Sequence, residues 1–168
     1  MKNLFKVFIV IAIVSTFSFT EAKAQISVGG GLVFGTRINT IGITANGKYE
    51  FTEDWSAAPA FTYFIPKDGF TWMALDLDAN YKITQFEGIG GLYGIGGLGM
   101  TFAHYKVEAD LGEFGSYSAS GTSTSAGLNL GAGLEIPLSE KMAVSPEMKI
   151  TIGNGSYFRI GAKIMFGL

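Results

Sequence analysis

Acidic and basic side chains alternate with apolar ones in the segment 73–83, MALDLDANYKI. In a β-strand successive side chains point to opposite faces, whereas a helix would leave this segment without an apolar face. The spacing therefore predicts a strand with Asp76, Asp78 and Lys82 on one face and the apolar residues on the other. Charges gathered on one face of a sheet can line an ion path, or they can neutralise one another in salt bridges.

Two other patterns resemble cofactor or catalytic motifs, and neither has the context that such a motif needs. Residues 94–99, GIGGLG, match the dinucleotide fingerprint G-x-G-x-x-G, but the sequence after them continues as a strand and not as a helix. His104 is the only histidine, and Lys106 stands where a deacylase-like His-x-Ser pattern would have its serine. One histidine and no cysteine disfavour a transition-metal site. We therefore expect no catalytic, cofactor-binding or metal-binding residues.

The alternation of apolar and polar residues recurs along the chain from residue 26. It continues through Asn46 and Gly47, a pair that often forms hairpin turns, because the apolar residues keep the same parity on both sides. In 88–105 glycine is so frequent that the two faces cannot be assigned. The pattern predicts about eight strands: 26–35, 40–51, 55–66, 73–83, 88–105, 120–136, 142–152 and 157–168.

A weak internal repeat aligns residues 52–63 with residues 139–150, as if four strands were used twice. Chance similarity between two strand-turn units is the alternative to duplication. Pro59 and Pro146 occupy equivalent positions in this repeat. Because proline cannot donate to a strand ladder, we expect both to lie in β-bulges near one rim of the sheet.

Residues 1–24 have the features of a secretory signal peptide. A basic start is followed by a long apolar run, and Ala22 and Ala24 stand at the two positions that a signal peptidase recognises. Cleavage before Gln25 would leave residues 25–168 as one domain, with an uncleaved membrane anchor as the alternative. The absence of cysteine excludes a lipoprotein anchor, and a net charge of −2 gives no reason to expect a nucleic-acid partner.

The composition of the polar face distinguishes two kinds of barrel. A soluble barrel of lipocalin type places its apolar face inside, whereas a transmembrane barrel places it outside, around a polar lumen. The polar face here is mostly Gly, Ser, Thr and Asn. Charged residues make up 15% of the chain, against a usual ~25%. Small residues with few charges suit a narrow lumen better than a surface exposed to water, so we expect the apolar face to meet lipid.

We expect the charges in the lumen to balance, because an unpaired buried charge costs several kcal/mol. Asp76 and Asp78 would pair across the lumen with Arg159 and Lys163. The predicted lumen charge network comprises Lys48, Glu50, Asp76, Asp78, Lys82, Glu135, Glu147, Lys149, Arg159 and Lys163. Aromatic residues near strand ends would form the interfacial girdles of a membrane barrel. The predicted aromatic girdle comprises Tyr49, Phe51, Trp55, Tyr63, Phe70, Trp72 and Tyr157.

With this pattern the chain resembles the small eight-stranded outer-membrane barrels of OmpA/OmpX type, within the porin-like outer-membrane β-barrel family. Its signal sequence resembles those of Bacteroidetes exports. The resemblance covers residues 25–168 and implies an all-β, antiparallel up-and-down transmembrane barrel in a Gram-negative outer membrane, with periplasmic termini. It also implies a monomer that contacts outer-membrane lipid and lipopolysaccharide and is recognised by the barrel-assembly machinery. The chain departs from the family in that Gly167 and Leu168 follow the C-terminal aromatic residue Phe166.

The expected function is structural, an envelope-maintaining barrel with a closed or narrow lumen and no enzymatic activity. Three alternatives remain: a lipid A deacylase-like enzyme, a soluble periplasmic lipocalin-like binder, and a pore gated by rearranging salt bridges. Only Lys106–Ser118 is predicted to form a long loop. Its acidic residues are expected to be solvated, with adhesion or cation binding as the alternative; they are Glu108, Asp110 and Glu113.

Overall fold

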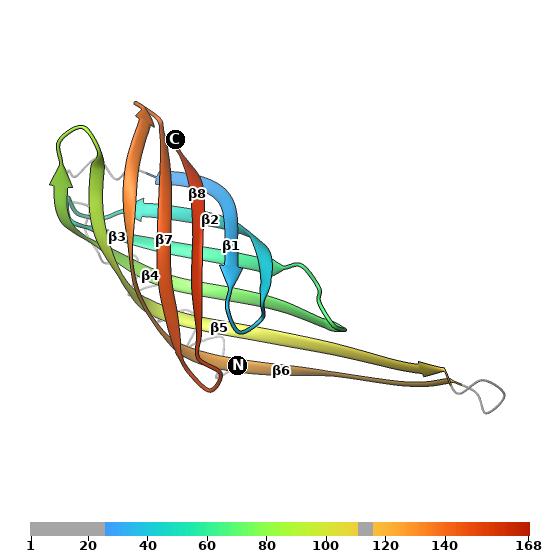
Figure 1. Cartoon of the computed structure of the whole chain (residues 1–168). Coiled ribbons are helices and arrows are strands. Elements are labelled where there is room, and N and C mark those ends of the chain that lie inside the picture. Colours follow the sequence, from blue (N-terminus) through green and yellow to red (C-terminus); the bar gives the residue numbers. More distant parts are fainter. Residues whose placement is uncertain (1–25, 111–115) are drawn as a thin grey trace, which may run out of the picture.

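Eight antiparallel strands close into a barrel in the computed structural model, which describes residues 26–110 and 116–168 (Figure 1). The strands are β1 (Ile26–Gly35), β2 (Thr40–Glu50), β3 (Trp55–Phe64), β4 (Phe70–Phe86), β5 (Gly90–Asp110), β6 (Ser116–Ser139), β7 (Met142–Gly153) and β8 (Tyr157–Gly167). Each strand pairs with the next, and β8 pairs with β1. The predicted up-and-down barrel is therefore confirmed. The signal peptide and its cleavage site before Gln25 lie outside the described residues, in which no helix could span a membrane.

The two ends of the barrel differ in the length of their strands. β1 begins and β8 ends at one end, here called the terminal end, because Ser27 pairs with Gly167. At the opposite, distal end the β5–β6 hairpin projects well beyond the other strands (Figure 1). Its strands have 21 and 24 residues, whereas β1, β2 and β3 have 10 or 11.

The prediction of a long loop over Lys106–Ser118 is wrong in part, because the strands of the projecting hairpin extend into this segment from both sides. Strand pairing continues as far as Asp110 and resumes at Ser116, so Glu108 and Asp110 belong to β5, and Glu113 lies outside the described residues. The serine-rich sequence of this hairpin has no apolar alternation. Two strands can still pair there through their backbones, because the hydrogen bonds of a ladder do not require an apolar face.

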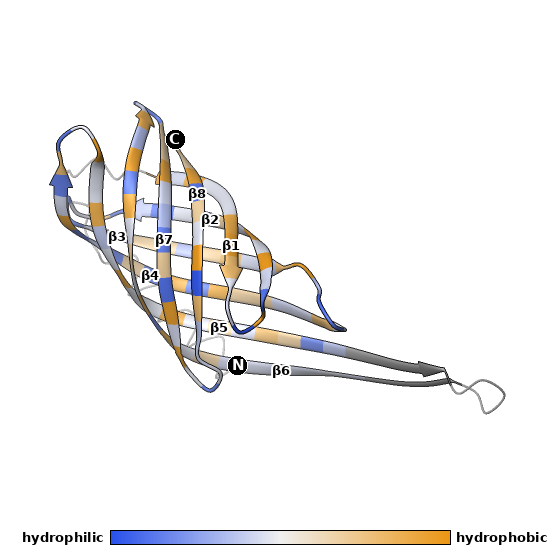
Figure 2. Ribbon diagram, viewed as in Figure 1, coloured by the Kyte–Doolittle hydropathy of each residue, from blue (hydrophilic) through white to orange (hydrophobic). Residues whose placement is uncertain are grey.

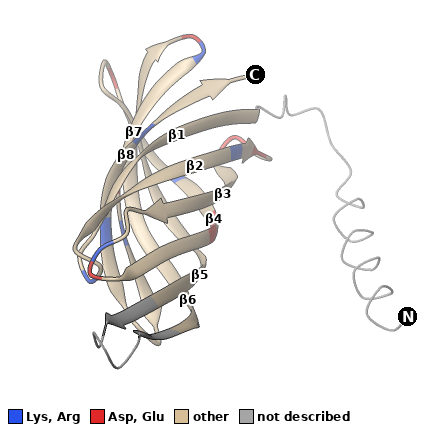
Figure 3. Cartoon of the chain, turned by 90° about the vertical axis from the view of Figure 1, so that its right-hand side faces the viewer, with Lys and Arg blue, Asp and Glu red and all other residues tan. Residues whose placement is uncertain are grey.

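The two faces of the barrel wall have opposite character, and this follows from the alternation in the sequence. On β4 the side chain of Leu77 is 60% exposed, whereas those of Asp76 and Asp78 on either side of it are 1% and 8% exposed. Every strand carries large apolar side chains that are exposed on the outside. Apolar residues recur along the strands as orange bands in Figure 2, and in Figure 3 charged residues occupy few positions along the strands. In β5, whose faces could not be assigned from sequence, Tyr93, Ile95 and Thr101 point inward.

Strand β2 runs without a break through Asn46 and Gly47, which pair with Gly29 and Val28 of β1. The continuous strand predicted for this segment is therefore confirmed.

The two prolines interrupt strand pairing without forming the predicted bulges. Pairing between β2 and β3 is missing only next to Pro59, and pairing between β6 and β7 is missing next to Pro146, while the register on both sides stays the same. Proline has no N–H to donate, so neither Pro59 nor Pro146 pairs with the preceding strand. Both still pair with a residue of the following strand, Pro59 with Leu77 and Pro146 with Ala162. The register shifts occur instead at Lys82/Thr84 and at Pro137/Ser139, both near the terminal end.

Candidate functional site

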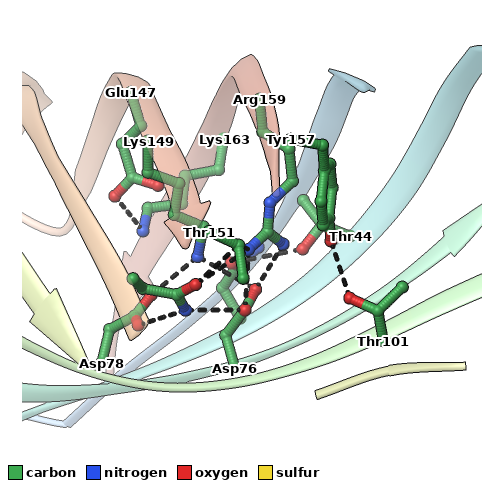
Figure 4. Close-up of polar contacts among 12 residues, drawn as sticks. Thr44, Asp76, Asp78, Thr101, Glu147, Lys149, Thr151, Tyr157, Arg159 and Lys163 are labelled. Atoms are coloured by element: carbon green, nitrogen blue, oxygen red, sulfur yellow. Dashed lines mark hydrogen bonds and ion pairs between the residues drawn. The ribbon is translucent and has the colours of Figure 1, made fainter. Parts of the chain in front are cut away.

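A salt bridge crosses the middle of the lumen between β4 and β8, which lie four strands apart in the ring of eight. Arg159 Nη1 donates to Asp76 Oδ2 at 2.7 Å, and Arg159 Nη2 donates to Asp76 Oδ1 at 2.9 Å (Figure 4). The side chains are 2% and 1% exposed. This is the bidentate geometry in which a guanidinium group and a carboxylate bind most strongly.

Lys149 and Asn129 extend the salt bridge to Asp78. Lys149 Nζ lies 2.9 Å from Asp76 Oδ2 and 2.6 Å from Asp78 Oδ2. Asn129 Nδ2 donates to Oδ1 of both aspartates at 2.8 and 2.7 Å, and its Oδ1 accepts a hydrogen bond from Thr151 Oγ1 at 2.7 Å. Two carboxylates and two cations therefore neutralise one another, and the amide adds hydrogen bonds to both aspartates, while Arg159 Nε has no hydrogen-bond partner in the described residues. We call Asp76, Asp78, Asn129, Lys149, Thr151 and Arg159 the central network. Buried charges are tolerated where each is paired with an opposite charge, as here.

The pairing expected for Lys163 is different in the structure. Lys163 Nζ lies 2.5 Å from Glu147 Oε1, which also accepts a hydrogen bond from the hydroxyl group of Tyr93 at 2.6 Å. Lys149 takes the expected place beside the aspartates, because the register of β7 and β8 sets it directly opposite Arg159. Along β8, Lys163 is the second inward-facing residue after Arg159 in the direction of the terminal end. At that level its neighbour is Glu147 and not the two aspartates.

Three more of the predicted lumen charges lie together at the terminal end. Lys48 Nζ lies 2.6 Å from Glu50 and 2.5 Å from Glu135. Lys82 is exposed, and it lines the same cavity of about 280 Å³ as these three residues. We call this space the mouth cavity. It opens at the terminal end and is separated from the distal end by the central network.

An apolar cluster fills the distal end of the lumen. It consists of Ile38, Phe64, Ala74 and Tyr157, with Val33 and Trp72 packed against it. We call this group the distal plug. The hydroxyl group of Tyr157 lies 3.1 Å from Thr101 Oγ1, and the Arg159 guanidinium lies 5.0 Å from the centre of the tyrosine ring. The distal plug thus rests directly on the central network.

The predicted aromatic girdle is wrong at two positions, because Trp72 and Tyr157 point into the lumen as part of the distal plug. Their parity could have shown this, since Trp72 stands in phase with Asp76, and Tyr157 in phase with Arg159. Four of the remaining girdle residues are exposed on the outside and Tyr49 is half-buried. The four exposed residues are Phe51, Trp55, Tyr63 and Phe70.

Neither motif-like pattern has a catalytic environment in the described residues. His104 is exposed on β5, and its Nδ1 lies 3.1 Å from Thr122 Oγ1, with no acidic partner found for it in the described chain. Residues 94–99 lie within β5, so no helix N-terminus follows them to bind a phosphate. No cluster of three potential metal ligands occurs in residues 26–105 and 120–168.

Similarity to known proteins is limited to the fold. No family model matches the chain, and no curated protein shows significant sequence similarity to it. Among solved structures, the N-terminal β-barrel domain of Pseudomonas aeruginosa OprF superimposes with a TM-score of 0.64 at 16% identity. The match covers 86% of this chain and 97% of that one.

Two further solved structures have the same fold. Ail, the attachment invasion locus protein of Yersinia pestis, was solved with the heparin analogue sucrose octasulfate. It matches with a TM-score of 0.56 at 17% identity over 86% of this chain and 97% of that one. Neisserial surface protein A matches with a TM-score of 0.55 at 15% identity, over 85% and 94% of the two chains. The chain therefore has the fold of small eight-stranded barrels that include outer-membrane proteins.

Proposed function

We propose that the protein is an integral outer-membrane β-barrel with a closed lumen and a structural, envelope-maintaining role. The observation that supports this proposal best is the apolar outer wall, where Ile43 and Leu77 are each 60% exposed. In water, apolar patches larger than a few hundred Å² are rare on monomers, whereas lipid requires such a band. The fold shared with OprF, Ail and NspA supports the same environment.

The closed lumen is inferred from the two layers that fill it. The central network and the distal plug lie one above the other, and an eight-stranded barrel is just wide enough for its own side chains. Such an interior favours a rigid structural element over a pore gated by rearranging salt bridges. A lipocalin-like binder would need the apolar face inside, and the deacylase alternative would need a serine nucleophile and an acidic partner beside His104 as the base.

The environment of the barrel also defines its proposed partners. Outer-membrane lipid and lipopolysaccharide would contact the apolar wall, and the barrel-assembly machinery would insert the chain as a monomer. The terminal end would then face the periplasm and the β5–β6 hairpin the outside of the cell. We further propose that the protein is not an enzyme.

The first test is the mobility of the protein in SDS gels before and after heating. A closed transmembrane barrel resists cold SDS, so the unheated and heated forms should migrate at different positions. The protein should also stay in the membrane fraction after osmotic shock. A single band at both temperatures, with the protein in the osmotic-shock fluid, would contradict the proposal.

A charge on the outer wall tests the lipid contact directly. Leu77→Arg, halfway along β4, should lower the stability of the barrel in lipid vesicles by about 2–4 kcal/mol, as expected for arginine near the midplane of a bilayer. The measurement is denaturant unfolding in vesicles, with Asn154→Arg in an exposed turn as the control. Equal stabilities of the two variants would show that Leu77 does not face hydrocarbon.

A further inference from the structure

Two Asn–Gly pairs occur in the sequence, Asn46–Gly47 and Asn154–Gly155, and the fold places them in contrasting environments. In such a pair the glycine nitrogen can attack the side-chain amide carbon of the asparagine, because glycine has no side chain to obstruct the approach. The attack requires a backbone that can bring the two atoms together, so the local geometry controls its rate. The same two residues can therefore react in one part of a fold and stay inert in another.

The pair Asn46–Gly47 is protected by its place within β2. Asn46 pairs with Gly29 of β1, and Gly47 pairs with Val28, so the ladder holds the backbone extended. The side chain of Asn46 accepts a hydrogen bond from Thr44 Oγ1 at 3.4 Å, and its Nδ2 is buried. An attack by the Gly47 nitrogen would have to bend the strand and break its pairing with β1.

The pair Asn154–Gly155 lies in the turn between β7 and β8, at the distal end of the barrel. Asn154 is exposed, and Gly155 has a φ of 113°, far from the extended conformation of a strand. The hydrogen bonds of this turn run between Gly153 and the Ser156 hydroxyl group, and the N–H of Gly155 has no acceptor within the described chain. The nitrogen that must attack is therefore free, and no ladder holds the backbone around it.

A cation lies beside this turn. A Cβ added at Gly155 would be 3.6 Å from Nη1 of Arg37, which belongs to the neighbouring turn between β1 and β2. The glycine nitrogen becomes negatively charged as it attacks, and a nearby positive charge favours the charged form of such a group. The arginine therefore promotes the attack, and it also attracts the carboxylate that the reaction produces.

From these observations we propose that Asn154 is a site of spontaneous deamidation in the folded barrel, promoted by Arg37. The Gly155 nitrogen forms a bond with Cγ of Asn154, and the bond from Cγ to the side-chain nitrogen breaks. Ammonia leaves with the proton that the glycine nitrogen has given up, and a succinimide ring remains. Water then opens the ring at either carbonyl carbon and gives aspartate or isoaspartate. The distal end thereby gains one negative charge as the protein ages.

Peptide mass spectrometry tests the proposal on the purified barrel, folded in a non-ionic detergent and incubated in mildly alkaline buffer. The peptide that contains Asn154 should gain, over time, the mass difference between an amide and a carboxyl group. It should also become a substrate for an isoaspartyl methyltransferase. The peptide that contains Asn46 should show neither change. In a parallel incubation in denaturant no strand protects Asn46, and both pairs should convert at similar rates.

Two variants test the residues assigned to the reaction. Asn154→Gln should lose the mass gain, because its longer side chain would have to close a larger and less favourable ring. Arg37→Gln should slow the conversion about threefold, since one charge acts here at short range through water. An unchanged Asn154 in the folded protein, or equal conversion of Asn154 and Asn46 there, would overturn the proposal. Equal rates with and without Arg37 would overturn the part assigned to the arginine.

Discussion

Arg159→Gln should lower the free energy of unfolding of the barrel by about 3–5 kcal/mol, the usual cost of removing one partner from a buried ion pair. The substitution leaves Asp76, which is 1% exposed, with Lys149 as its one remaining cation, and Lys149 is already shared with Asp78. One negative charge in the centre of the lumen is then uncompensated. Denaturant unfolding in detergent or vesicles, followed by the fluorescence of Trp55 and Trp72, measures the loss.

Matched variants separate this effect from the loss of any arginine. Arg37→Gln, in the exposed turn between β1 and β2, should leave stability unchanged. Asp76→Asn alone should destabilise the barrel, and combined with Arg159→Gln it should cost less than the sum of the two single changes, because the double variant has no unpaired charge. Wild-type stability of both single variants would show that the pair does not hold the network together.

Gly97→Ala should destabilise the barrel by about 3 kcal/mol, at the upper end of the range for overpacked cores. A Cβ at this position would lie 2.5 Å from the Leu77 carbonyl oxygen and 2.6 Å from Asp78 Cα, and it would overlap the Asp78 carboxylate. The backbone of β4 cannot move away without breaking its pairing with β5. The displaced carboxylate would also lose its contacts with Lys149 and Asn129.

The adjacent residue provides the control for this prediction. A Cβ added at Gly96 meets no atom within 4 Å. Gly96→Ala should therefore be neutral, or it should stabilise the barrel by about 0.4–1 kcal/mol because alanine restricts the unfolded chain. Unfolding curves of the two variants should separate clearly. If they coincide, the inward side of β5 does not approach β4 as closely as the structure shows.

These two predictions concern the same physical feature, a layer of paired charges in the middle of the lumen. Such a core is stable only while every charge has a partner, and the small residues around it leave the space that the long cationic side chains need. Glycine at Gly97, Gly131 and Gly161 faces this space. The stability of the barrel therefore depends on these paired charges and on the glycines beside them.

The strands and their two faces could be predicted from the sequence because the period of two is a local property of the chain. Leu77 and Asp76 differ in exposure because neighbouring side chains on a strand point to opposite faces, and this alternation does not depend on the rest of the fold. The pairing of the buried central charges was also predictable, since an unpaired buried charge costs several kcal/mol. Residues 88–105 were the exception, because glycine has no side chain to mark a face.

The tertiary structure decided which charges meet. Lys149 and not Lys163 lies beside the aspartates, because the register of β7 and β8 and the diameter of the barrel fix which side chains share a level. The parity of Trp72 and Tyr157 already places them inward, but only the tertiary structure brings them together with Ile38 and Phe64 in the distal plug. The mouth cavity arises where a turn and two register shifts converge from separate strands, a coincidence in space that has no pattern along the sequence.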